Sequence, residues 1–200
     1  MIYDGPPSRM LPALVAVIRR NLDARMRCLY FNSPAMVAGL RSQLYAAGTD
    51  VAHEIKRGAL VLACDDGHLV DGRFAIDRMI GVLDEAVDDA VASGYAGLFA
   101  TGDMTWEFGP EKDFSKLVDY EWRLEQLFLK QPSLSGICQY HRDLVPSDAL
   151  RIGAVSHEKV FVSDTLSRLN PHYVRARSPA ERRVAAQSEL ALGALLALED

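Results

Sequence analysis

The side chains best suited to binding chemistry lie together in one short segment, residues 101–107 (TGDMTWE). Asp103 and Glu107 offer carboxylates there, and Met104 and Trp106 offer apolar surface. The segment follows an apolar run, residues 95–101, that is typical of a buried strand. In open α/β sheets, ligands bind outside the carboxyl ends of the strands, and small-molecule pockets combine apolar walls with a few polar groups. The pattern predicts a binding loop for a small organic molecule, with core packing as the alternative for its apolar members.

A second group of candidate side chains follows the next expected strand. That strand, residues 134–140, ends in Gln139 and Tyr140, which should face the same crevice as the first group. Tyr120 and Glu121 lie on the helix between the two strands. Since neighbouring helical positions point in different directions, the two side chains cannot share one direction. We expect all four residues to belong to the candidate ligand site.

The aromatic residues are concentrated in the same stretch of chain. Of 16 aromatic residues, 9 lie between Tyr95 and Tyr140. Trp122 and Phe128 occupy helical positions where core packing is the simpler interpretation. For Trp106, which lies beyond a strand end, a pocket role and a packing role both stay open.

Motifs for catalysis or metal binding are absent from the sequence. There is no G-x-x-x-x-G-K-[ST] phosphate loop, no G-x-G-x-x-G after an expected strand, and no G-x-S-x-G. The histidines show no paired metal-ligand spacing, and Cys28, Cys64 and Cys138 form no C-x-x-C. Each cysteine lies in an apolar run, which predicts a buried thiol. We therefore expect no metal site, no cofactor and no enzymatic activity.

Charge and hydropathy narrow the possible partners and location. The chain has 22 basic and 27 acidic residues, a formal net charge of −5. This balance argues against direct nucleic-acid binding, which needs clustered basic side chains. The longest apolar stretch, residues 191–198, is far shorter than the roughly 20 residues of a membrane span. With no signal-peptide pattern at residues 1–10, we expect a cytoplasmic protein that does not enter membranes.

The elements that position these residues alternate between helices and strands. Ser33 and Pro34 mark a helix start, and Gly48 and Gly94 mark helix ends. The apolar pattern predicts helices over residues 9–25, 34–47, 74–92 and 114–129, and a short helix from residue 146. It predicts strands over residues 28–31, 59–64, 95–101, 134–140 and 159–162. The strands are apolar on both faces, which is typical of a parallel sheet covered by helices. The fold class is therefore α/β, with a three-layer, mostly parallel sheet flanked by helices.

The C-terminal segment has a different pattern. Ser178 and Glu181 form a capping box, with Pro179 at the first helical position. The expected helix, residues 179–198, becomes apolar nearly all round towards its end. It should pack against its own domain, form a dimer or bind a signalling partner. We expect two parts: a domain over residues 1–175 and a terminal helix within residues 176–200.

The same stretches, taken in order, resemble the MEDS domain, a sensory domain named for methanogens, methylotrophs and the DcmR regulator. The matching pieces are RCLY at 27–30, GALVL at 58–62, GRF at 72–74, DRM at 77–79, GYAGL at 94–98, TGDMTW at 101–106, LVDYE at 117–121, ICQY at 137–140 and NPHY at 170–173. Asp103 stands where the family commonly has Glu. The resemblance implies a RecA/KaiC-like fold with a degenerate phosphate loop. It also implies a sensory function, usually joined to an output module.

Three functions remain open from the sequence. The first is a non-catalytic sensory or regulatory domain that binds a small organic molecule near Trp106 and signals through protein contacts of the C-terminal helix. The second is a ligand-free interaction module that works by dimerisation or partner docking. The third is a RecA-like nucleotide-binding protein with an atypical phosphate site, in which Asp103 would hold Mg²⁺ and Glu107 would orient water.

Overall fold

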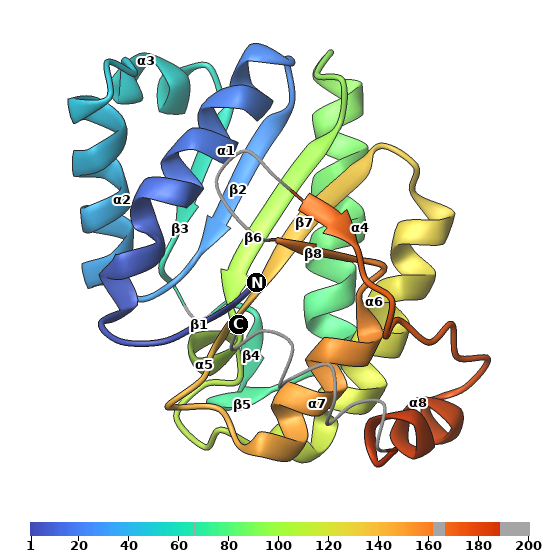
Figure 1. Cartoon of the computed structure of the whole chain (residues 1–200). Helices are drawn as coiled ribbons and strands as arrows, with labels where there is room; N and C mark the ends of the chain where they lie inside the picture. Colours follow the sequence, from blue (N-terminus) through green and yellow to red (C-terminus); the bar gives the residue numbers. More distant parts are fainter. Residues whose placement is uncertain (66, 162–166, 189–200) are drawn as a thin grey trace.

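A parallel five-stranded sheet forms the middle layer of the molecule (Figure 1). The computed structural model describes residues 1–65, 67–161 and 167–188. The strand order is β1-β7-β6-β2-β3, and every neighbouring pair is parallel. The strands are β1 (Ile2–Tyr3), β2 (Arg27–Phe31), β3 (Leu60–Ala63), β6 (Leu98–Asp103) and β7 (Leu134–His141). The predicted α/β class with a three-layer parallel sheet is confirmed.

Three helices cover one face of the sheet. They are α1 (Leu11–Asp23), α2 (Pro34–Ala46) and α3 (Val51–Lys56). The buried side chains of α1 recur at helical spacing and pack with Tyr30 and Leu60 of the sheet. Ser33 accepts a hydrogen bond from the Met36 backbone N–H, so it caps α2 as the sequence predicts.

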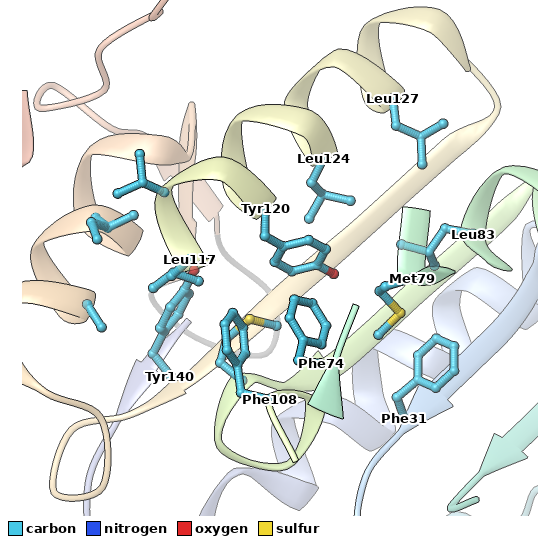
Figure 2. Packing of buried hydrophobic residues seen from close by; sticks show 14 of the residues in the cluster. Phe31, Phe74, Met79, Leu83, Phe108, Leu117, Tyr120, Leu124, Leu127 and Tyr140 are labelled. Atoms are coloured by element: carbon cyan, nitrogen blue, oxygen red, sulfur yellow. The ribbon is translucent and has the colours of Figure 1, made fainter. Parts of the chain in front are cut away.

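The opposite face carries the larger part of the core. Its helices are α4 (Ile76–Ala92), α6 (Leu117–Lys130) and α7 (Ser147–Ser156). Figure 2 shows Tyr120, Leu124 and Leu127 of α6 lying over the sheet, with Phe74 and Phe108 stacked below Tyr120. Much of the aromatic cluster expected between Tyr95 and Tyr140 is therefore core on this face.

Several short elements lie outside the sequence predictions. The one-turn helix α5 (Met104–Glu107) follows β6 directly, so the expected binding loop there is wrong in its local structure. Two antiparallel hairpins, β4 (Leu69–Val70) with β5 (Arg73–Phe74) and β8 (Lys159–Phe161) with β9 (Ser167–Leu169), lie apart from the central sheet. The strand expected at 159–162 is thus present over its first three residues, but it pairs in a hairpin rather than in the sheet.

The final described helix, α8 (Pro179–Ala186), begins as the capping box predicts. The Ser178 hydroxyl accepts a hydrogen bond from the Glu181 N–H, while the Glu181 carboxylate accepts one from the Arg177 N–H. Arg182 is fully buried and pairs with Glu125 of α6, which ties α8 to the domain. The helix ends at Ala186, so the prediction is wrong for Gln187 and Ser188, and residues 189–198, with most of the apolar stretch, lie outside the described residues.

One cysteine prediction is wrong. Cys28 is buried, but Cys64 is exposed just beyond the end of β3. Within the described part of the chain, no helix is long and apolar enough to cross a membrane.

Candidate functional site

Asp103 ends β6 and organises the polypeptide that follows it. Its Oδ2 accepts a hydrogen bond from the Tyr3 hydroxyl at 2.5 Å, and its Oδ1 accepts one from the Thr105 N–H at 2.8 Å. The Thr105 hydroxyl also donates to Oδ1. Because Asp103 caps α5 in this way, the chain turns into a helix instead of forming an open loop. Both carboxylate oxygens are engaged, which leaves Asp103 poorly placed to hold a magnesium ion.

Glu107 points back from α5 into the interior. Its carboxylate lies against Gly102, where an added Cβ would come within 1.8 Å of Oε1, so only glycine leaves room for it there. The Tyr120 hydroxyl donates to Oε2 at 3.2 Å. Burial raises the pKa of Glu107 from 4.5 to about 8, with a smaller contribution from the negative charge of Asp103. A neutral, enclosed carboxyl is unsuited to orienting water for hydrolysis.

A second buried carboxylate, Glu121, lies on the other side of α6. The Tyr140 hydroxyl donates to its Oε1, and His157 Nε2 lies 3.6 Å from its Oε2. The Cys138 Sγ completes a group whose three ligand atoms lie within 4.8 Å of one another. Burial raises the pKa of the Cys138 thiol well above its ordinary value, and the nearby Glu121 charge adds to this. This Glu–Cys–His group is a potential metal site.

Gln139 links the two central strands within the sheet. Its Nε2 donates to the Thr101 hydroxyl at 2.6 Å, and that hydroxyl donates to the Ile137 carbonyl at 2.7 Å. The Gln139 Oε1 is buried and has no partner among the described residues. Gln139 is fully enclosed, so its main role here is to join β6 and β7.

Trp106 lies on the wall of an open cavity. The cavity has a volume of about 430 Å³, and its lining includes His68, Leu69 and Thr105. The ring centroids of Trp106 and His68 are 4.9 Å apart, and His68 Nε2 lies 3.0 Å from the Glu107 carbonyl oxygen. The cavity therefore lies against α5, which carries the buried Glu107 on the side facing the protein interior.

A second cavity, of about 320 Å³, lies beside Tyr140. Its walls include His157 of the α7 C-terminus, Val160 and Phe161 of β8, and Asn170. Sequence patterns did not single out His157 or Val160, because these residues come together only when the β8–β9 hairpin folds against α7. Tyr140 thus faces both this cavity and the Glu121 carboxylate.

The predicted site residues divide into an inner and an outer set. Trp106 lines one open cavity and the buried Tyr140 lines the other, whereas the remaining six lie in the interior beneath the strand ends. Seven of the predicted residues are at most 3 % exposed: Asp103, Met104, Glu107, Tyr120, Glu121, Gln139 and Tyr140. Register brings Asp103 opposite Gln139, as expected for neighbouring parallel strands. Sequence reasoning missed Tyr3 and His68. Tyr3 lies on a two-residue strand that carries no periodic signal.

Comparison with known proteins identifies a family. No curated protein matches the chain, and no solved structure matches it. The family model described as the methanogen/methylotroph, DcmR sensory domain matches residues 1–158. The match spans most of the 200 residues and covers β1 to the end of α7, and with them the sheet and the buried carboxylates of Asp103, Glu107 and Glu121. The chain therefore belongs to the MEDS family of sensory domains.

Proposed function

We propose that this protein is a non-catalytic sensory domain that binds a small organic molecule in the cavity beside Trp106. The ligand class includes halogenated hydrocarbons and other small hydrocarbon derivatives. Binding is read out through protein contacts and involves no chemical change of the ligand. Membership of a sensory family supports the regulatory role, and the cavity beside Trp106 is the observation that carries the assignment.

The position of the cavity fits this role. The chain connects β2 to β3 through helices on one face of the sheet, and β3 to β6 through α4 on the other. Ligands of open α/β sheets bind at the carboxyl ends of the strands where such a change of side occurs. Phe31 at the end of β2 lies 6.4 Å from His68 between ring centroids, and His68 contacts Trp106. The volume of about 430 Å³ lies within the range of small-molecule pockets.

A chain of contacts joins the cavity to the C-terminal helix. Trp106 and Glu107 lie on the same one-turn helix, α5, and Glu107 accepts a hydrogen bond from Tyr120 of α6. Further along α6, Glu125 pairs with the buried Arg182 of α8. A ligand that shifts α5 therefore displaces Glu107, which is linked through Tyr120 and Glu125 of α6 to Arg182 of α8. These contacts support signalling through the C-terminal segment.

The fluorescence of Trp106 tests the proposal. The chain has 2 tryptophans, so Trp122→Phe leaves Trp106 as the only one. A panel of short alcohols, ketones, amines and haloalkanes is titrated into this variant. We expect one ligand class to shift the Trp106 emission in a saturable manner. At a concentration of 100 Kd, the same ligand should stabilise the fold by about 2.7 kcal/mol, visible as a higher Tm.

Two control variants define the binding place. Trp106→Phe with Trp122 retained should lose the fluorescence response. Val160→Phe, which narrows the second cavity, should keep the response with unchanged affinity. An unchanged emission and Tm across the whole panel would refute ligand sensing. A response abolished by Val160→Phe would move the site to the second cavity.

A further inference from the structure

The group formed by Glu121, Cys138 and His157 brings together three side chains of metal-ligand type that the proposed ligand cavity does not include. The thiol comes from β7, the carboxylate from α6 and the imidazole from the residue after α7, and their ligand atoms lie within 4.8 Å of one another. The sequence shows no metal-ligand spacing because these residues are 17 and 19 positions apart, on separate elements. We propose that they bind one divalent transition-metal ion of the zinc class.

The distances suit a tetrahedral ion. Zinc bonds of about 2.0–2.3 Å place neighbouring ligand atoms about 3.4–3.6 Å apart. His157 Nε2 and Glu121 Oε2 are already 3.6 Å apart, which is too far for a good hydrogen bond. The other distances between ligand atoms are at most 4.8 Å, so binding requires them to shorten by up to about 1.3 Å.

The surrounding hydrogen bonds hold two ligands in a binding orientation. His157 Nδ1 lies 2.8 Å from the Gly153 carbonyl oxygen, so Nδ1 carries the proton and Nε2 presents its lone pair to Glu121. This arrangement, in which the second ring nitrogen donates to a backbone carbonyl, is typical of metal-bound histidine. The Tyr140 hydroxyl fixes the Glu121 carboxylate in the same manner.

A thiolate and a carboxylate together carry two negative charges, which attract a divalent cation in the interior. The Met1 ammonium group, which donates to the Cys138 carbonyl oxygen at 2.7 Å, is a further charge near them. Binding releases the thiol proton of Cys138 to solvent, and a sulfur–metal bond replaces the S–H bond. Soft sulfur and borderline nitrogen ligands favour zinc over magnesium or calcium, which prefer oxygen.

The ion would keep one coordination position for another ligand. Zinc sites with three protein ligands leave the fourth position to water or a small molecule, whereas purely structural sites use four. His157 lines both the cavity of about 320 Å³ beside Tyr140 and a further cavity of about 260 Å³ that also contacts Cys138. Both cavities therefore lie next to His157, one of the three proposed ligands.

Cobalt substitution tests the proposal on the full chain. Protein treated with a chelator is titrated with Co²⁺ in the absence of oxygen, with elemental analysis of the zinc-loaded form in parallel. We expect one ion per chain and a thiolate-to-cobalt charge-transfer band in the near ultraviolet, displaced by Zn²⁺. His157→Gln should weaken binding at least 100-fold, and Tyr140→Phe, which alters only the support of Glu121, about 10-fold.

The cysteines provide matched controls. Cys138→Ser should abolish the charge-transfer band, while Cys64→Ser, at an exposed thiol, should leave both band and affinity unchanged. Circular dichroism of each variant establishes that it is folded. His157 is 28 % exposed, so His157→Gln provides a second test if Cys138→Ser disturbs the core. The absence of a band in the native sequence, or an unchanged band and affinity in both Cys138→Ser and His157→Gln, overturns the assignment.

Discussion

Replacing Glu107 by glutamine should change how the stability of the protein depends on pH. Burial raises the pKa of Glu107 from 4.5 to about 8, so the folded protein holds a proton there that the unfolded chain has lost at neutral pH. Glutamine has nearly the same shape and never titrates. Its carbonyl oxygen can still accept the hydrogen bond from Tyr120.

The sign and size follow from proton linkage. Below pH 4.5, Glu107 is protonated in both states and the contribution to stability is fully present. As pH rises towards 8, the unfolded chain releases the proton first, so the free energy of unfolding falls by about 1.4 kcal/mol per pH unit. The rise in the pKa of Glu107 from 4.5 to about 8 corresponds to about 5 kcal/mol in all. About 3 kcal/mol of this is lost between about pH 5 and pH 7.

Urea denaturation followed by circular dichroism measures this difference. The free energy of unfolding of Glu107→Gln, relative to the native sequence, should rise by about 3 kcal/mol between about pH 5 and pH 7. Glu85→Gln, at an exposed glutamate of α4, is the control and should show no such trend. If the native protein and Glu107→Gln have parallel pH profiles, Glu107 is ionised at neutral pH and the reasoning from burial fails.

Two further predictions concern packing around the sheet. Tyr3→Phe removes the hydroxyl that donates to Asp103. Because a buried carboxylate oxygen loses its donor, we expect the free energy of unfolding, measured by urea denaturation, to fall by about 1.5–3 kcal/mol. An unchanged midpoint would show that water replaces the hydroxyl without cost. Gly136→Ala would place a Cβ 2.4 Å from the Ala100 carbonyl oxygen, whereas a Cβ at Gly81 in α4 meets no atom within 4 Å. We therefore expect Gly136→Ala to lower the Tm, and Gly81→Ala to stabilise the fold by about 0.5–1 kcal/mol through helix propensity. A calorimetric Tm that changes in the same direction in both variants would contradict this.

The sequence predicts the main helices and strands because each follows a simple period. The apolar runs ending at Phe31, Thr101 and Tyr140 became the central strands, and the capping signals at Ser33 and Ser178 mark true helix starts. These features depend on residues that are close along the chain, so local chemistry is enough to find them.

The candidate site is harder to predict because it depends on contacts between distant residues. Asp103 and Gln139 could be placed together, since parallel neighbours end at the same edge. Tyr3 and His157 could not, because no period marks a two-residue strand or a residue just beyond a helix. The short helix α5 was also missed, since it arises from the Asp103 cap on a segment with no helical repeat of its own. The RecA/KaiC-like relation stays a prediction.

The place of β1 in the sheet has a consequence for how the chain assembles over time. Its only partner strand in the described sheet is β7, and Ile2 pairs with Tyr140. A ribosome must therefore synthesise more than two thirds of the protein before the first strand has anything to join. Such distant pairings are slow, because a long stretch of chain must be ordered first. Until β1 joins the sheet, Asp103 lacks the Tyr3 hydroxyl, so the polar interior is completed only late in folding.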